Sequence, residues 1–156
     1  MRSYDYLIIG GGIAGVTAAE TIRSQDAHAT IGILSDEPHI LYSRVLLPSY
    51  LKNKIPRERL FLRSEANFVE RRIDLLLQEK VTKIDTLHKE VITAAGTSFG
   101  YRKLLIASGG KVRPWGETVH EPFIFRLQTL DDADKLHQAL SQIQHPVVTG
   151  ASFIAL

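Results

Sequence analysis

The chain has 156 residues, of which 44% are hydrophobic and 23% are charged, and its formal net charge is +2 at pH 7. A chain of this length and composition predicts about one globular domain with a buried core and excludes a disordered protein. Cysteine is absent, which excludes disulfides, thiolate metal sites and a dithiol redox centre. The basic residues are scattered, so nothing supports a nucleic-acid partner, and no apolar run approaches the ~18 residues of a membrane span.

Two further classes of feature are missing from the sequence. The histidines include no pair at the i, i+4 spacing that would place two imidazoles on one helical face, so we expect no metal site. The first predicted strand begins within a few residues of Met1. This leaves no room for a signal peptide and favours a cytoplasmic protein.

The most informative segment is 4–15, where a short apolar run leads directly into a Gly-x-Gly-x-x-Gly loop. Residues 6–9 predict a buried parallel strand, and residues 13–23 carry small and apolar side chains at helical spacing. Strand, loop and helix therefore follow one another in the order of a dinucleotide-binding unit.

Each glycine of the loop has a separate physical purpose. Gly10 permits the tight turn, Gly12 lets the backbone approach a pyrophosphate, and Gly15 lets the helix pack close to the sheet. The phosphates would face the N-terminus of the helix, where Ile13 and Ala14 begin the first turn and the free N–H groups favour anions.

An acidic residue after the second strand strengthens this interpretation, because the glycine pattern alone is weak evidence. Residues 30–34 predict that strand, and Ser35 and Asp36 follow it. Asp36 comes 21 positions after Gly15, close to the roughly 20 typical of a carboxylate that binds a ribose 2′-OH. Glu37 is an alternative ribose partner, since the ends of predicted strands vary by a residue or two.

The middle of the chain predicts smaller elements. A short helix is expected at 46–51, and residues 57–72 predict either one amphipathic helix or two short turns over the sheet. Residues 73–77 are an apolar strand candidate. Short alternating segments then predict a three-stranded antiparallel meander, at 80–85, 90–93 and 97–101.

A further strand is predicted at 103–107, apolar after its first residue and therefore buried on both faces. Thr129 and Asp132 are spaced like a variant capping box at the start of a helix that continues to Ile143. Residues 145–156 begin another strand and a glycine turn without a following helix. We therefore expect a fragment, with an FAD-binding domain at 1–145 and the start of a truncated NAD-binding domain at 146–156.

These segments in this order resemble the FAD domain of the pyridine nucleotide-disulfide oxidoreductase superfamily. The resemblance is to its cysteine-free branch, which contains ferredoxin and rubredoxin reductases and the large subunit of NADH-dependent nitrite reductase. It covers nearly the whole chain and rests on the motifs at 8–15, 34–38 with 42–44, 101–109 and 127–133. It implies an α/β, Rossmann-like fold, in which a parallel sheet flanked by helices carries a three-stranded antiparallel meander.

The resemblance also implies a cofactor site. The first glycine loop would hold the FAD pyrophosphate and the acid after the second strand would hold the adenosine ribose. Arg44 would lie beside the flavin, the backbone of Val81 would contact adenine, and the loop 107–109 would close over FAD. The expected cofactor-binding residues are Gly10, Gly12, Ile13, Ala14, Gly15, Ser35, Asp36, Glu37, Arg44, Val81, Ala107, Ser108, Gly109 and Arg126.

The sequence departs from the family pattern at three places. Ser49 stands where the family often has a lysine near the flavin, and Gln128 stands where it has an arginine. Arg126 lies two residues before Gln128, on the same face of an extended segment, and could partly substitute. In the second glycine loop, Ser152 and Ala155 replace glycines, which would crowd a bound NAD.

The resemblance implies the FAD-binding part of an NAD(P)H-dependent flavoprotein oxidoreductase that passes electrons to a carrier protein or a metal centre. No side chain is expected to be catalytic, because the flavin performs the chemistry. In the family a later segment completes the FAD site, so we expect this chain alone to bind FAD weakly or to be purified without it, and to expose apolar surface that favours a homo-oligomer. The alternative is a non-catalytic nucleotide-binding module with a structural or regulatory role. An NAD-dependent dehydrogenase does not fit the meander or the 107–109 loop.

Overall fold

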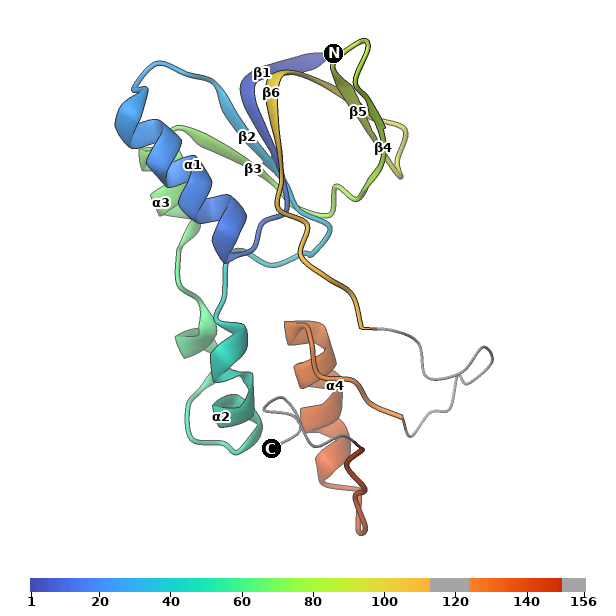
Figure 1. The fold of residues 1–156 in the computed structure, drawn as a ribbon. Coiled ribbons are helices and arrows are strands. Elements are labelled where there is room, and N and C mark those ends of the chain that lie inside the picture. Colours follow the sequence, from blue (N-terminus) through green and yellow to red (C-terminus); the bar gives the residue numbers. More distant parts are fainter. Residues whose placement is uncertain (113–123, 150–156) are drawn as a thin grey trace.

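The computed structural model describes residues 1–112 and 124–149. A six-stranded mixed sheet forms its centre, in the order β3-β2-β1-β6-β5-β4 (Figure 1). The first four strands in this order are parallel, β5 is antiparallel to β6, and β4 is antiparallel to β5. The predicted α/β fold with an antiparallel meander is thus confirmed. The strands are β1 (Arg2–Ile9), β2 (Ile31–Leu34), β3 (Ile73–Leu76), β4 (Val81–Asp85), β5 (Glu90–Thr93) and β6 (Ser98–Ile106).

In the described part of the chain, two longer and two short helices accompany the sheet. They are α1 (Ile13–Gln25), α2 (Leu47–Leu51), α3 (Glu65–Glu70) and α4 (Leu130–Leu140), with 3₁₀ turns at Arg44–Leu46 and Arg57–Leu60. Residues 57–72 do not form one continuous helix: they form a 3₁₀ turn and the short helix α3, which is nearer to the second of the two alternatives. The chain is extended between them, where Phe61 forms a β-bridge with Tyr42. Helix α3 begins afresh at Ser64, whose N–H donates to the Asn67 side chain at 3.0 Å.

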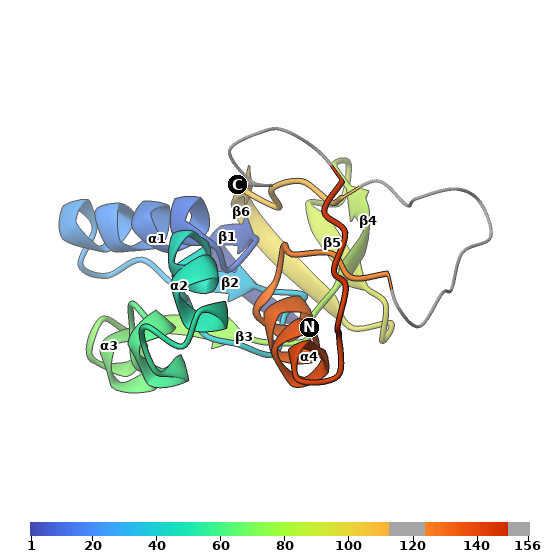
Figure 2. The same cartoon turned by 90° about the horizontal axis from the view of Figure 1, so that it is seen from below.

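The parallel part of the sheet is covered on both faces. Helices α1 and α3 cover one face, where Ile8, Ile31 and Ile33 pack against Val16 and Phe68. The meander curls over the other face (Figures 1 and 2). There, the buried side chains come from both parts of the sheet: Tyr4, Leu7, Leu34, Val91 and Phe99.

Strand β6 corrects two predictions. The expected strands 97–101 and 103–107 are one continuous strand, because β1 pairs with it from Phe99 to Ile106. Its first residues pair with β5, while pairing with β1 extends along its length to Ile106. The prediction that this apolar end is buried on both faces is wrong. Leu105 and Ile106 are 40% and 61% exposed, since no described element covers them there.

Helix α4 packs against α2 beyond the carboxyl ends of the strands (Figure 1). The predicted capping box is confirmed: Asp132 N donates to Thr129 Oγ1 at 3.1 Å, and Thr129 N donates to Asp132 Oδ2 at 2.9 Å. The helix ends at Leu140, three residues before the expected end. Its apolar side joins a separate small core made by Tyr42, Leu47, Leu60, Leu130 and Ala133.

The end of the chain is described only in part. Val147 and Val148, where a strand is predicted, are exposed and lie outside any strand, as a strand forms only where another strand pairs with it. The second glycine loop, with Ser152 and Ala155, lies outside the described residues. Among the described residues, none of the helices has the length and apolarity that a membrane crossing requires.

Candidate nucleotide-binding site

Three neighbouring parallel strands, β2, β1 and β6, end at the same edge of the sheet. The glycine loop follows the central one and is held from both sides. Gly10 N donates to Leu34 O of β2 at 2.8 Å, and Ala107 N donates to Ile9 O at 2.8 Å. The predicted site residues on either side of the loop are therefore brought together at the carboxyl ends of the strands, where open α/β sheets bind ligands.

Two of the loop glycines are required by the fold. Gly10 has φ +117°, a left-handed conformation, and a Cβ there would overlap the Ala107 carbonyl oxygen. A Cβ on Gly15 would overlap the Gly10 carbonyl oxygen. Gly12 is different, because a Cβ at that position would meet no atom within 4 Å. The space in front of Gly12 is thus open to a ligand.

The N-terminus of α1 faces this open space without a competing side chain. Its N-cap residue is Gly12, no side chain caps it, and the first turn carries no acidic residue. The first N–H groups of a helix have no partner within the helix and carry its partial positive charge. An anion such as a diphosphate fits this donor set, and the residues present therefore fit the phosphates of a dinucleotide.

The two carboxylates after β2 lie in different surroundings. Asp36 is about half exposed, with its Oδ2 atom 3.6 Å from Lys111 Nζ. Glu37 is more buried and accepts hydrogen bonds from Tyr42 Oη and Arg44 Nη2, each at 2.6 Å. Asp36 is thus the carboxylate freer to accept from a ribose, while Glu37 anchors the loop that carries Arg44.

Tyr42 connects Glu37 to α4. Its hydroxyl donates to Glu37 and accepts from Leu130 N at 3.0 Å. Burial, followed by the hydrogen bond to Glu37, raises the pKa of Tyr42 well above its usual range, so the hydroxyl keeps its proton. Sequence reasoning missed this role, and the only signal was an aromatic residue two positions before Arg44.

Gln128 is a second residue whose contacts were not predicted. Its Nε2 donates to Gly110 O at 2.6 Å, and its Oε1 accepts from Val112 N at 3.0 Å. The segment after the 107–109 loop is therefore tied to the start of α4. Arg126, which was expected to substitute for the arginine missing at 128, is exposed and makes no hydrogen bond or ion pair within the described part of the chain.

The remaining predicted residues are placed as follows. Ser35 is buried, and a Cβ on Gly11 would lie 2.9 Å from its side chain. Ser108 is exposed, and Gly109 adopts a left-handed φ of +67°. Val81 begins β4 beside a bulge and packs its side chain against the core under the meander. The contact of its backbone with adenine stays a prediction.

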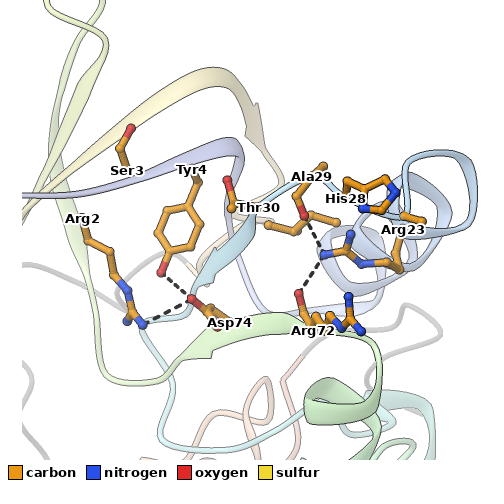
Figure 3. A pocket seen from close by; sticks show the side chains of 11 residues that line it. Arg2, Ser3, Tyr4, Arg23, His28, Ala29, Thr30, Arg72 and Asp74 are labelled. Atoms are coloured by element: carbon orange, nitrogen blue, oxygen red, sulfur yellow. Dashed lines mark hydrogen bonds and ion pairs between the residues drawn. The ribbon is translucent and has the colours of Figure 1, made fainter.

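A cavity of about 360 Å³ lies at the opposite edge of the sheet, where the parallel strands begin (Figure 3). Its polar groups bind one another. Asp74 Oδ2 accepts from Tyr4 Oη at 3.0 Å and lies 3.3 Å from Arg2 Nη2. Burial, together with Asp74, raises the pKa of Tyr4 to about 12, so Tyr4 remains a donor. Arg23 donates to main-chain carbonyls. These contacts hold the strands and helix ends together.

Comparison with known proteins gives the same family. A family model described as pyridine nucleotide-disulphide oxidoreductase matches residues 4–156. A ferredoxin-NAD(+) reductase component of 3-phenylpropionate/cinnamic acid dioxygenase, from Photorhabdus laumondii, is 34% identical over 159 residues. That match covers 100% of this chain and 40% of the relative.

Solved structures agree. The ferredoxin reductase for the CYP199A2 system from Rhodopseudomonas palustris has a TM-score of 0.89 and 32% identity, covering 97% of this chain and 38% of that one. NADH:rubredoxin oxidoreductase from Clostridium acetobutylicum has a TM-score of 0.82 and 26% identity, and the match covers 90% of this chain and 36% of that one. The chain thus spans well under half the length of these proteins. Its matched residues, fold and glycine-loop geometry show that the chain belongs to the pyridine nucleotide-disulphide oxidoreductase family.

Proposed function

We propose that residues 1–145 form the FAD-binding part of an NAD(P)H-dependent oxidoreductase. The observation that carries this proposal is the uncapped N-terminus of α1 behind the open space at Gly12. Gly10 before it and Gly15 after it are required, because a Cβ at either position would overlap a main-chain carbonyl oxygen, whereas no contact in the described fold requires a glycine at position 12. A bound pyrophosphate explains why a side chain is absent there.

The described residues would divide the work of binding. The first N–H groups of α1 bind the phosphates, and Asp36 accepts hydrogen bonds from the adenosine ribose. Glu37 and Tyr42 hold the loop that presents Arg44, and the 107–109 loop would close over FAD from the β6 side. FAD, when bound, supplies the flavin ring that accepts a hydride from NAD(P)H and releases electrons.

The electron acceptor follows from the relatives only as a class. This chain is similar, over its whole length or nearly so, to the two ferredoxin reductases and the rubredoxin oxidoreductase named above. We therefore propose a small iron–sulfur or iron–thiolate carrier protein as the partner. Nitrite reduction and a metal-centre acceptor stay predictions, as do the truncated NAD-binding domain at 146–156 and its crowded second glycine loop.

Equilibrium dialysis of the purified chain against FAD tests the cofactor proposal. We expect binding weaker than micromolar but saturable at one FAD per chain, and competed by ADP. Absence of saturable binding would overturn the proposal. Submicromolar binding would instead show that no further segment is needed to complete the site.

A second function, a nucleotide-binding module without electron transfer, is favoured by one observation. Gln128 replaces the expected arginine, and both polar atoms of its side chain form hydrogen bonds with the main chain of Gly110 and Val112. Anaerobic titration of the whole protein with NADH separates the two functions. Loss of flavin absorbance supports the reductase, and a flavin that stays oxidised supports the module.

A further inference from the structure

A lysine and an aspartate meet across the glycine loop. Asp36 follows β2 and Lys111 follows β6, and these two strands are separated by β1. Even so, Lys111 Nζ lies 3.6 Å from Asp36 Oδ2. Because the glycine loop follows β1, between the two strands, this ion pair joins the two segments that flank the loop.

The segment that carries Lys111 is fixed from both of its sides. Gln128 holds the main chain at Gly110 and at Val112 by hydrogen bonds of 2.6 and 3.0 Å. Before it, Gly109 turns the chain with a left-handed φ of +67°. Lys111 is thus presented between two anchored residues, while its own side chain is 74% exposed and free to move.

The two ion pairs beyond the strand ends, Arg44–Glu37 and Lys111–Asp36, differ in how easily the cation can leave its carboxylate. Arg44, a second cation beyond the ends of the strands, is held by Glu37 at 2.6 Å. The Lys111 pair is longer and more exposed, and exposed pairs of this kind contribute little to stability. Lys111 is therefore the cation that can leave its carboxylate for a doubly charged ligand at small cost.

We propose that Lys111 binds the diphosphate of the nucleotide, and that in doing so it leaves Asp36 free to accept from the ribose. This inference rests on the proposed nucleotide site and adds a residue to it. The lysine side chain suits the task because its compact ammonium group has three donors on a flexible stem. In this arrangement Lys111 pairs with the phosphates. Asp36 then no longer pairs with Lys111, and its carboxylate can accept hydrogen bonds from the ribose.

Isothermal titration of the purified chain with ADP and, separately, with adenosine tests the inference. Lys111→Ala should weaken ADP binding by about tenfold, the equivalent of one charge-assisted hydrogen bond. Adenosine binding should be unchanged or tighter, because Asp36 has lost its competing cation. Lys111→Arg should keep ADP affinity close to that of the wild type. Lys83→Ala, at an exposed position on β4, removes the same charge elsewhere and should leave both affinities unchanged.

A second variant tests the anchoring of the segment without changing charge. Gln128→Met removes both hydrogen bonds and should weaken ADP binding in the same direction as Lys111→Ala, again with little effect on adenosine. Equal losses for ADP and adenosine in Lys111→Ala, or no loss for either, would overturn the role of Lys111 while the nucleotide site stands. A wild-type chain that binds neither ADP nor FAD would overturn the proposed function as well.

Discussion

Single glycines in the first loop serve two different purposes. At Gly12 a side chain has room in the protein but would occupy the space proposed for the pyrophosphate, whereas at Gly15 a side chain would overlap the Gly10 carbonyl. We expect Gly12→Val to keep the melting temperature of the wild type and to lose FAD binding by at least about tenfold. Differential scanning fluorimetry and FAD dialysis measure the two effects.

Gly15→Ala is the comparison variant, and we expect it to lower the stability of the fold, which Gly12→Val should leave unchanged. Because backbone must shift to admit the methyl group, we expect a loss of about 1–3 kcal/mol in the free energy of unfolding. A Gly12→Val protein that binds FAD as tightly as the wild type would show that the glycine loop does not hold the cofactor.

Tyr42 is a residue whose hydroxyl serves two partners. Tyr42→Phe removes the donor to Glu37 and the acceptor for the buried Leu130 N–H. We expect the free energy of unfolding to fall by about 1–3 kcal/mol, because a buried polar group is left without a partner. Urea denaturation measures the loss. Tyr101→Phe offers a control, since that hydroxyl has no hydrogen bond in the described part of the chain, and it should change stability by less than about 0.5 kcal/mol.

At the scale of elements, Arg23 joins the ends of two helices. Its guanidinium donates to Asp26 O and Ala29 O after α1, and to Arg71 O and Arg72 O after α3, at 2.7–3.0 Å. Helix C-termini present unpaired carbonyls and a partial negative charge, both of which a guanidinium satisfies.

Arg23→Leu should therefore lower the free energy of unfolding by about 1–3 kcal/mol. Arg71→Leu is the control, because Arg71 reaches Glu20 only at 3.8 Å and a carbonyl only at 3.4 Å. Urea denaturation of both variants compares them. Equal effects of the two variants would contradict the proposed role of Arg23 as the link between helix ends.

The packing of α4 should depend on pH through Asp134. Burial raises the pKa of this carboxyl, but hydrogen bonds from Arg57 and Tyr50 outweigh burial and bring the pKa below its usual value of 3.8. A lowered native pKa contributes stability above the unfolded pKa, and this contribution is lost as the pH falls through the native pKa.

We expect the wild type to lose stability more steeply than Asp134→Asn on acidification from about pH 5 to pH 3. Because the side chains of Arg57 and Asp134 are 37% and 24% exposed, solvent screening keeps the difference to about 1 kcal/mol or less. Urea denaturation across this pH range measures it. Parallel pH profiles for the two proteins would show that Asp134 does not couple the packing of α4 to protons.

At the scale of the whole molecule, the end of β6 is an open edge. Among the described strands, only β1 pairs with residues 102–106, and Leu105 and Ile106 are exposed. Unpaired strand edges with apolar side chains favour association with another chain. We therefore expect the chain to self-associate, as the sequence also predicts.

Leu105→Lys should reduce this association without unfolding the protein, because a charge on an exposed edge opposes pairing. Sedimentation velocity over a range of concentrations measures it. Val69→Lys is the control, since Val69 is 77% exposed on α3, away from this edge. Association that Leu105→Lys leaves unchanged would place the contact elsewhere.

The sequence by itself determined the features that depend on neighbouring residues. The glycine loop, the capping box at Thr129 and the strand at 73–76 each follow from a local pattern whose physical cause lies within a few residues. The absence of cysteine likewise excluded a dithiol redox centre within these 156 residues without any structure.

Tertiary structure decided the features that join residues far apart in the chain. The continuity of β6 depends on pairing with β1, some 97 positions earlier at Arg2↔Phe99, and an exposed Arg102 conceals it in the sequence. The contacts of Tyr42 with Leu130, of Gln128 with Gly110 and of Lys111 with Asp36 carry no periodic signal. Local patterns encode which element forms, whereas packing alone decides which side chains meet beyond the ends of the strands.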